Sequence, residues 1–175
     1  MSVNAVSPIR ARVLLRPPRA SDQDEFLAAV RASRGLHRPW VKPPATDAQF
    51  RDYLKRMRRA ENRAFFVLRR GDPRLVGVVN LTQIVHGLFR SAYLGYYVFA
   101  GFERQGLMRA GLRAAVCRAF DKLRLHRLEA NIQPGNFASI ALVRSCGFSR
   151  EGYSPKYLKI GGRWRDHERW AVIAR

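Results

Sequence analysis

One stretch of the sequence decides the fold: Gly101-Phe102-Glu103-Arg104-Gln105-Gly106-Leu107-Met108. The segment before it, Ala92 to Val98, is rich in tyrosine and predicts a strand, and the segment after it, Leu107 to Lys122, has the apolar spacing of a helix. A helix N-terminus presents free N–H groups and the positive end of the helix dipole, which together bind phosphate. The stretch therefore predicts a phosphate-binding loop, with an ordinary turn as the alternative.

The residue types in this loop suit a phosphate group. Gly101 and Gly106 let the backbone approach a ligand closely, and Arg104 and Arg109 bracket the turn with charges that fit a pyrophosphate or a ribose phosphate. The spacing matches neither GxGxxG nor GxxxxGK followed by Ser or Thr, and no acidic residue stands where a ribose ligand is expected. Dinucleotide-binding and P-loop folds are therefore excluded.

The segments on both sides of the loop predict a mixed α+β fold. A strand from Arg127 to Ile132 follows the helix, and the order strand, helix, strand predicts a parallel pair. Upstream, Ala64 to Arg69 and Leu75 to Val85 predict a hairpin and the beginning of an antiparallel meander. The other predicted elements are a strand at Ala11–Leu15, a helix over Asp22–Ser33 opened by a capping signal at Ser21 and Asp24, a helix over Asp47–Glu61 opened by Thr46 and Gln49, a helix from Asn136 or Phe137 to Ser145 closed by Gly147, and a hairpin of Phe148–Tyr157 and Arg165–Ile173 around Gly161-Gly162.

Length and composition predict a single cytosolic domain over residues 1–175. With 175 residues, 47% of them hydrophobic, the chain is long enough for one sizeable core and short for two. We find no apolar run long enough to span a bilayer, and the start lacks the basic and then apolar pattern of a secretory signal. Cys117 and Cys146 lie in apolar stretches without metal-ligand partners, so we expect reduced structural thiols and no metal site.

The charge is strongly basic. Lysine and arginine number 33 against 13 acidic residues, a formal net charge of +20. Such a surface attracts polyanions, so the partner is expected to be RNA, the ribosome or a phosphate-rich cofactor. An arginine-rich proteome with a solvated basic surface is the alternative, because the basic residues are spread over the whole chain.

Two later motifs follow the loop, Asn136-Phe137-Ala138-Ser139 and Arg144-Ser145-Cys146-Gly147-Phe148. In their order and spacing, the loop and these two motifs resemble the acetyl-CoA-binding core of the GNAT superfamily of N-acetyltransferases. The segments His126-Arg127-Leu128-Glu129-Ala130-Asn131 and Trp164-Arg165-Asp166-His167 resemble its RimJ/RimL branch, which acetylates N-termini of ribosomal proteins. The resemblance implies the GNAT fold: a mixed, mostly antiparallel sheet of about six or seven strands with a splayed parallel pair, flanked by about four helices.

The resemblance also implies a cofactor site for acetyl-CoA. The backbone at Val98 would pair with the pantetheine arm, and Asn136 would bond the same arm. The pyrophosphate would lie on the backbone amides of the loop, with Arg109 nearby. The residues that supply these amides are Arg104, Gln105, Gly106, Leu107 and Met108. The chain departs from the family pattern at Glu103 and Met108, and we expect the Glu103 side chain to point away from the pyrophosphate.

Acetyl transfer needs a neutral amine and assistance to the leaving thiolate. An α-amine has a pKa of about 7.7–8.0, so part of it is already neutral at pH 7. By resemblance Glu129 is the candidate base, although it would alternatively neutralise Arg127 or Lys122. The position of the usual family tyrosine is Val143, and the resemblance to the RimL-like branch implies Ser139 as the candidate acid instead. An ordinary helix-capping serine is the alternative.

The expected acceptor is the N-terminal α-amine of a protein, with Ala or Ser at its start, attacked directly in a ternary complex. Trp40 is expected to floor a peptide groove or to pack under its loop, and Asn80 and Gln83 are expected near the amine, where they would hold a water. The partners are then acetyl-CoA and a ribosomal protein, with an rRNA contact, for a monomer or homodimer. A GNAT enzyme for a small-molecule amine and a non-catalytic RNA-binding protein are the alternatives.

Overall fold

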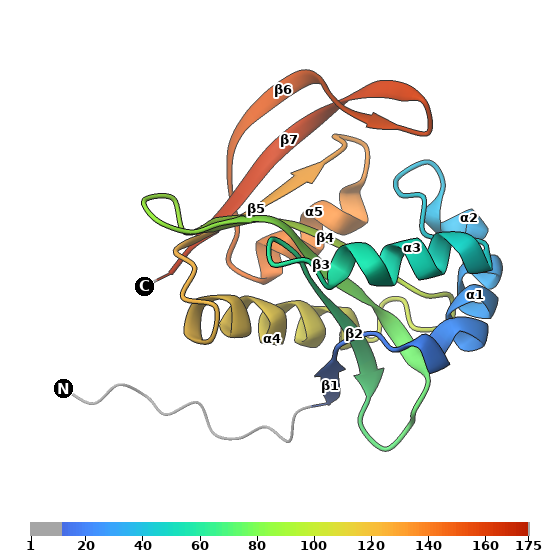
Figure 1. The fold of residues 1–175 in the computed structure, drawn as a ribbon. Coiled ribbons are helices and arrows are strands. Elements are labelled where there is room, and N and C mark those ends of the chain that lie inside the picture. Colours follow the sequence, from blue (N-terminus) through green and yellow to red (C-terminus); the bar gives the residue numbers. More distant parts are fainter. Residues whose placement is uncertain (1–11, 175) are drawn as a thin grey trace.

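A computed structural model describes residues 12–174, and the predicted strand residue Ala11 lies outside them. The molecule is built on a seven-stranded sheet in the order β1-β2-β3-β4-β5-β7-β6 (Figure 1). The strands are β1 (Val13–Arg16), β2 (Arg63–Arg69), β3 (Leu75–Val85), β4 (Ser91–Val98), β5 (Arg127–Ile132), β6 (Ser149–Ile160) and β7 (Arg163–Ile173). The helices are the 3-10 turn η1 (Ala20–Asp22), α1 (Gln23–Ala32), α2 (Arg34–His37), α3 (Asp47–Met57), α4 (Leu107–Asp121) and α5 (Phe137–Ser145).

The one parallel contact of this sheet joins β4 to β5, while the other neighbouring strands pair antiparallel. The parallel register runs only from Ser91 opposite Arg127 to Tyr93 opposite Glu129. Both strands continue beyond these residues, to Val98 and Ile132, so they diverge toward their carboxyl ends. The predicted splayed parallel pair is confirmed, and α4 is the crossover that a parallel connection requires.

The N-terminal helices begin and end differently from the prediction. The capping signal at Ser21 and Asp24 is wrong, because Asp22 accepts the backbone N–H of Arg19 at 2.7 Å and is itself bound by Arg16, at the end of β1, at 2.6 and 2.8 Å. The capping signal at Thr46 is confirmed, since its Oγ1 accepts the N–H of Gln49 at 3.3 Å. A fifth α-helix, the four residues of α2, exceeds the about four expected.

Helix α3 ends at Met57 rather than at Glu61. Side chains that follow it take the carbonyl groups of its last turn and of the loop. Asn62 Nδ2 donates to the carbonyl of Arg56 at 3.0 Å, and the Arg63 guanidinium donates to the carbonyls of residues 59, 60 and 62. These bonds replace further helical turns, which is a common way to end a helix.

The hairpin of β6 and β7 extends further than predicted, with its turn at Gly161 and Gly162 in the left-handed region. Its register shifts between Ser154 and Leu158. Asp166 stabilises this irregularity, because it accepts the Lys156 N–H at 2.8 Å and the Tyr153 hydroxyl at 2.5 Å. The irregular segment brings Tyr157 to the edge of the face described below.

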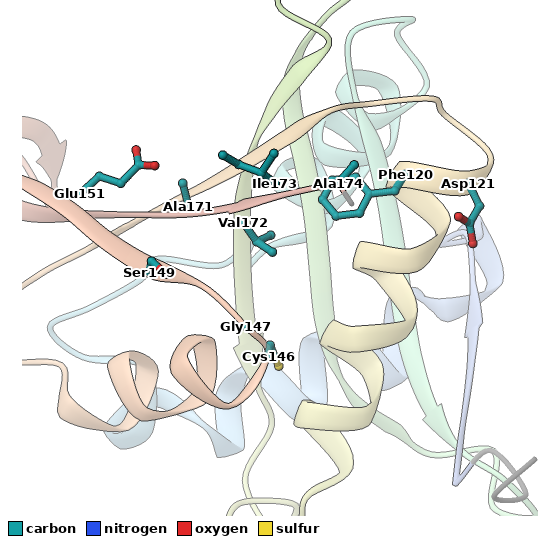
Figure 2. A pocket seen from close by; sticks show the side chains of 10 residues that line it. All are labelled: Phe120, Asp121, Cys146, Gly147, Ser149, Glu151, Ala171, Val172, Ile173 and Ala174. Carbon is teal, nitrogen blue, oxygen red and sulfur yellow. The ribbon is translucent and has the colours of Figure 1, made fainter. Parts of the chain in front are cut away.

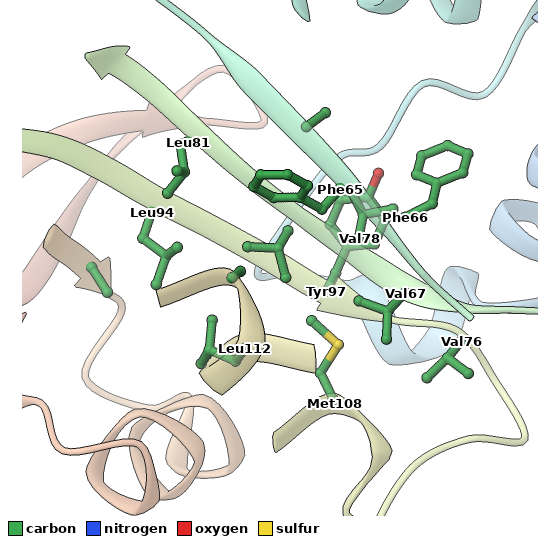
Figure 3. Packing of buried hydrophobic residues seen from close by; sticks show 14 of the residues in the cluster. Phe65, Phe66, Val67, Val76, Val78, Leu81, Leu94, Tyr97, Met108 and Leu112 are labelled. Atoms are coloured by element: carbon green, nitrogen blue, oxygen red, sulfur yellow. The ribbon is translucent and has the colours of Figure 1, made fainter. Parts of the chain in front are cut away.

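The two faces of the sheet are covered by different helices. On one face α4 lies close to β2 and β3, because Gly111 and Gly77 have no side chain: an added Cβ would come 2.7 Å from Val67 at the first and 2.9 Å from Met108 Sδ at the second. Figure 3 shows Val67, Met108 and Leu112 in this layer. On the other face, α1 and α3 pack an aromatic cluster against the sheet, formed by Phe26, Phe50, Tyr53, Phe66 and Phe99.

Side chains alternate between these faces along each strand. Leu94, Tyr96 and Val98 of β4 share the α4 face with Gly77, and Tyr93, Gly95 and Tyr97 share the other face with Asn80. On β5, Glu129 lies opposite Tyr93 and therefore faces the α1 and α3 side. We call this second surface the acceptor face, defined by Asn80, Tyr93, Gly95, Glu129 and Asn131.

The cysteines are both free, but they differ in exposure. Cys117 is exposed, so the expectation of a structural thiol is wrong for it, whereas Cys146 is partly buried and packs against the core. Within residues 12–174, no three His, Cys, Asp or Glu side chains come together as metal ligands would. In the same range, every helix is too short or too polar to cross a lipid bilayer.

Candidate active site

The loop between β4 and α4 presents a row of free backbone amides. Gly106, at the N-cap of α4, has φ +72° and Arg104 has φ +56°, both in the left-handed region. Within residues 12–174, the amides of residues 104–109 donate to no protein acceptor. Such orphan donors at a helix N-terminus form a binding site for an anion.

Side chains at the start of the loop hold its shape. The Gly101 N–H donates to the Glu103 carboxylate at 2.6 Å, and Gln105 Nε2 donates to the Gly101 carbonyl at 2.6 Å. Glu103 is thus engaged at the beginning of the loop, which leaves the amides of residues 104–109 open. Leu107 and Met108 are 1% and 7% exposed, so their side chains anchor the loop in the core.

Basic side chains from distant parts of the chain surround these amides. A Cβ added at Gly106 would lie 3.6 Å from an Arg12 guanidinium nitrogen and 4.0 Å from one of Arg109. Arg104 is exposed on the same loop. Sequence reasoning missed Arg12, because only the packing of α4 against β1 brings it to the loop. The arginines and the free amides together fit the diphosphate of coenzyme A.

Beyond Tyr93 and Glu129, β4 and β5 no longer pair with each other. Phe99 N donates to the Val76 carbonyl of β3, so the polar backbone groups of Val98 face away from β3, toward the split between β4 and β5. The Val98 carbonyl accepts from Nε2 of His37 at 2.8 Å. The His37 side chain is 4% exposed, and this contact holds the end of β4. Burial lowers the pKa of this imidazole.

Asn136 caps α5, the helix that follows β5. Its Oδ1 accepts the Ser139 N–H at 3.2 Å, so its carboxamide oxygen serves the helix and its predicted bond to the pantetheine arm stays a prediction. Trp40 lies nearby, since a Cβ added at Gly135 would meet its ring at 3.3 Å, and its carbonyl accepts from Gln133 at 3.4 Å. This is the packing contact that the alternative for Trp40 describes.

The candidate base Glu129 forms an ion pair on the acceptor face. Arg127 Nε donates to its Oε1 at 2.8 Å, and the same guanidinium also binds Glu151. The alternative expectation, that Glu129 neutralises Arg127, therefore describes a contact that exists. Next to it on β4, a hydrogen bond with Tyr157 and partial burial raise the pKa of Tyr93 to about 12. Tyr93 is consequently a neutral hydroxyl beside the carboxylate.

The candidate acid Ser139 is bound to a tyrosine of β4. The Tyr96 hydroxyl lies 2.5 Å from Ser139 Oγ and 3.1 Å from the Ser139 carbonyl. Val143, one turn further along α5, is fully buried and contributes no polar atom. The structure therefore joins Ser139 to a tyrosine that sequence reasoning had not considered for the site.

Two polar residues of β3 were expected near the amine. Asn80 lies on the acceptor face and its Oδ1 accepts the Tyr53 hydroxyl at 2.8 Å. Gln83 is exposed, with φ +52°, where the register of β3 and β4 shifts after Thr82. The structure brings Asn80 toward Gly95 and leaves Gln83 at the irregular end of the strand.

The structure adds two groups to the acceptor face. Asn131 Oδ1 and Arg165 Nε are buried atoms that have no hydrogen-bond partner within residues 12–174. Asn131 shares its face with Glu129, two residues earlier, and lies opposite Arg169, which shares that face with Arg165. Strand alternation from Glu129 would have placed Asn131 here, whereas no local signal pointed to Arg165, whose Nε is the buried atom.

A separate hollow of about 560 Å³ lies away from these groups, between the end of α4 and strands β6 and β7. Figure 2 shows Phe120, Asp121 and Cys146 at its wall. None of the predicted site residues lines it. This hollow is therefore distinct from the site built around the loop and the split.

The comparisons with known proteins all indicate the same family. The sequence family described as "Acetyltransferase (GNAT) domain" matches residues 12–149. "Probable N-acetyltransferase YjcK" of Bacillus subtilis (strain 168) is 30% identical over 169 residues, covering 92% of this chain and 93% of that protein. The alanine N-acetyltransferase of ribosomal protein uS5 from Escherichia coli (strain K12) is 38% identical over 96 residues, covering 55% of this chain and 50% of that protein.

Solved structures have the same fold. Mycobacterium smegmatis RimJ in complex with CoA-disulfide superposes with a TM-score of 0.85 at 28% identity, over 93% of this chain and 82% of that one. Spermidine N-acetyltransferase from Vibrio cholerae, in complex with CoA and spermine, gives a TM-score of 0.79 at 22% identity, over 94% of this chain and 96% of that one, a likeness of fold alone. The chain therefore belongs to the GNAT family of acetyltransferases and transfers the acetyl group of acetyl-CoA to an amine.

Proposed function

We propose that this enzyme acetylates the N-terminal α-amine of a protein, and specifically of a ribosomal protein that begins with Ala or Ser. The relative from E. coli acts on an alanine of ribosomal protein uS5, and the M. smegmatis structure is a RimJ. The observation that carries the proposal is the pair of buried, unpartnered atoms on the acceptor face. One of them, Asn131 Oδ1, accepts hydrogen bonds, and the other, Arg165 Nε, donates them.

A peptide N-terminus satisfies both atoms, because it offers N–H donors and carbonyl acceptors. Arg165 lies four positions before Arg169 on β7, and Arg169 is the residue opposite Asn131. At about 3.3 Å per residue this is about 13 Å, the length of roughly four residues of extended peptide. A polyamine offers only donors, so Arg165 would stay unsatisfied and would repel it.

The charges of the acceptor face also favour a peptide over a polyamine. Its carboxylate Glu129 is already paired with Arg127, and Arg165 and Arg169 add positive charge on the same face. A polyamine carries several positive charges and needs several free carboxylates, whereas an α-amine carries one. The formal net charge of +20 acts in the same direction at longer range.

The residues of the site account for the parts of the reaction. Acetyl-CoA supplies the activated thioester. The amine approaches over Gly95, where an added Cβ would meet nothing within 4 Å, and Tyr93 and Tyr157 border this opening. Glu129 uses the oxygen that Arg127 leaves free to take the proton of the amine, directly or through a water held near Asn80.

Transfer takes place directly in a ternary complex, without an acetylated cysteine. Burial raises the pKa of Cys146, so that its thiol carries little thiolate at neutral pH. Its Sγ lies 3.8 Å from the carbonyl of Arg109, on the α4 side of the sheet. The amine is therefore the nucleophile that attacks the thioester.

The proposal is tested with matched acceptors and purified protein. One peptide begins with a free Ala, a second has the same sequence with a blocked N-terminus and an internal Lys, and the third acceptor is spermidine. We expect a mass gain of one acetyl group on the α-amine of the first peptide only. Acetylation of spermidine with no turnover of the free peptide would establish the small-molecule alternative instead. The proposed contact of the basic surface with rRNA, and the state as monomer or homodimer, need separate binding and sedimentation measurements.

A further inference from the structure

Tyr96 lies between the cofactor loop and the point where the two parallel strands meet. A pantetheine arm that enters the split from residues 104–109 would pass Val98 and then Tyr96. It would then reach the level of Tyr93 and Glu129, where β4 pairs with β5. The side chain of Tyr96 points to the α4 face, and its hydroxyl reaches Ser139 in the first turn of α5. Glu129 points to the opposite face at the level where the strands meet. The site thus has one polar group on each side of the split.

We propose that Tyr96 is a positioning residue for acetyl transfer, which orients the Ser139 hydroxyl toward the leaving sulfur of coenzyme A. The inference rests on the proposed role of Ser139 and adds the group that directs it. When the amine forms its N–C bond, the C–S bond breaks and its electron pair stays on sulfur. Ser139 O–H donates a hydrogen bond to this thiolate and Tyr96 O–H donates one to Ser139 Oγ. Solvent later supplies the proton of the thiol.

The two hydroxyl groups can share their protons in either of two ways. In one, Tyr96 gives its single proton to the Ser139 carbonyl, at 3.1 Å, and Ser139 donates to the Tyr96 oxygen, at 2.5 Å; in the other, Tyr96 donates to Ser139 Oγ. When Tyr96 donates to Oγ, the proton of Ser139 is left for another acceptor, and within residues 12–174 Oγ has no other partner. A ligand atom in the split is then its natural acceptor.

The environment keeps Tyr96 in the required form. Burial raises the pKa of this phenol, so it remains a neutral donor throughout the working pH range. In a site of low polarity, two hydrogen bonds in series strengthen each other, and the free thiol is acidic enough, with a reference pKa of about 8.5, to leave as a stabilised anion. No proton has to leave either hydroxyl, which removes the difficulty of a serine as a strong acid.

The position of the Tyr96 hydroxyl fits the absence, in this chain, of the tyrosine that many relatives carry on the helix. The helix residue where many relatives carry a tyrosine is Val143, which has no polar group and is fully buried. A tyrosine hydroxyl nevertheless reaches the N-terminal turn of α5, but it comes from β4. Its contact is with Ser139 rather than with a ligand directly, so Tyr96 acts through the serine.

The test compares Tyr96→Phe with Tyr97→Phe. The second variant removes the neighbouring hydroxyl of β4, which lies on the other face of the strand, is buried and has no partner within residues 12–174. We expect Tyr96→Phe to lower kcat about tenfold, the effect of one lost hydrogen bond, and to leave the KM for acetyl-CoA unchanged. Tyr97→Phe should leave both constants unchanged.

A double variant separates orientation from simple support of the fold. If Tyr96 acts through Ser139, Ser139→Ala combined with Tyr96→Phe should lose no more activity than Ser139→Ala alone. Losses that multiply would overturn the proposal, as would a raised KM for acetyl-CoA at unchanged kcat. Equal loss of kcat in Tyr96→Phe and Tyr97→Phe would also overturn it. Thermal unfolding of each variant shows that the measurements were made on folded protein.

Discussion

Gly106→Ala should strain the loop and so reduce coenzyme A binding, the stability of the fold, or both. Gly106 has φ +72°, a region that costs an L-residue with a Cβ about 1–2 kcal/mol. The new methyl group would lie 3.6 and 4.0 Å from nitrogens of Arg12 and Arg109, which is ordinary van der Waals contact, so neither guanidinium group has to move. Backbone strain is therefore the main effect.

The strain can lower either the stability of the fold or the affinity for CoA, and both quantities can be measured. If the loop keeps its conformation, the free energy of unfolding falls by about 1–2 kcal/mol; if it relaxes to negative φ, the amides turn away and CoA binding weakens about fivefold to thirtyfold. The sum of the two losses is expected to stay near the full strain. Isothermal titration with CoA and denaturant unfolding measure the two parts.

Two control variants make this result specific. Gly95→Ala adds a methyl group where nothing lies within 4 Å and should change neither CoA affinity nor stability. Arg12→Ala removes a guanidinium without strain, so it should weaken CoA binding in a salt-dependent manner at unchanged stability. If Gly106→Ala kept both wild-type affinity and wild-type stability, the loop would not depend on the left-handed conformation, and the assignment of its amides to the diphosphate would fail.

Two further predictions concern the acceptor face and the support of β4. Glu129→Gln, which keeps the shape of the side chain, should lower kcat about a hundredfold at pH 7 and lose less at high pH, where the amine is already neutral; equal kcat in both proteins would leave Glu129 only its contact with Arg127. For His37, burial lowers the pKa in the folded state below the unfolded value of about 6.5, so its contribution to stability is present above that value and is lost as pH falls through the folded pKa. Unfolding measured between pH 7 and 5 should show this loss, and His37→Gln should show less of it; identical pH profiles would contradict the assignment to His37.

Much of the fold follows from local patterns. The strands at Leu75–Val85 and Arg127–Ile132 have the predicted bounds. Their β-branched residues and their alternation are local signals that extend over only a few positions. The start of α4 at Leu107 was predicted from glycine and turn chemistry in the same way. The failed capping signal at Ser21 shows the limit, since Arg16 binds Asp22 and shifts the start of α1.

The sequence by itself determined the glycine-bearing turn before α4 and the family of the chain, because both depend on residues that are neighbours along the backbone. Only the tertiary structure decided which side chains surround that loop and the split. Arg12 meets Gly106, His37 meets Val98, and Tyr96 meets Ser139 across long separations in the chain. Such contacts are set by sheet register and helix packing, which act over the whole core, and no local pattern of residues encodes them.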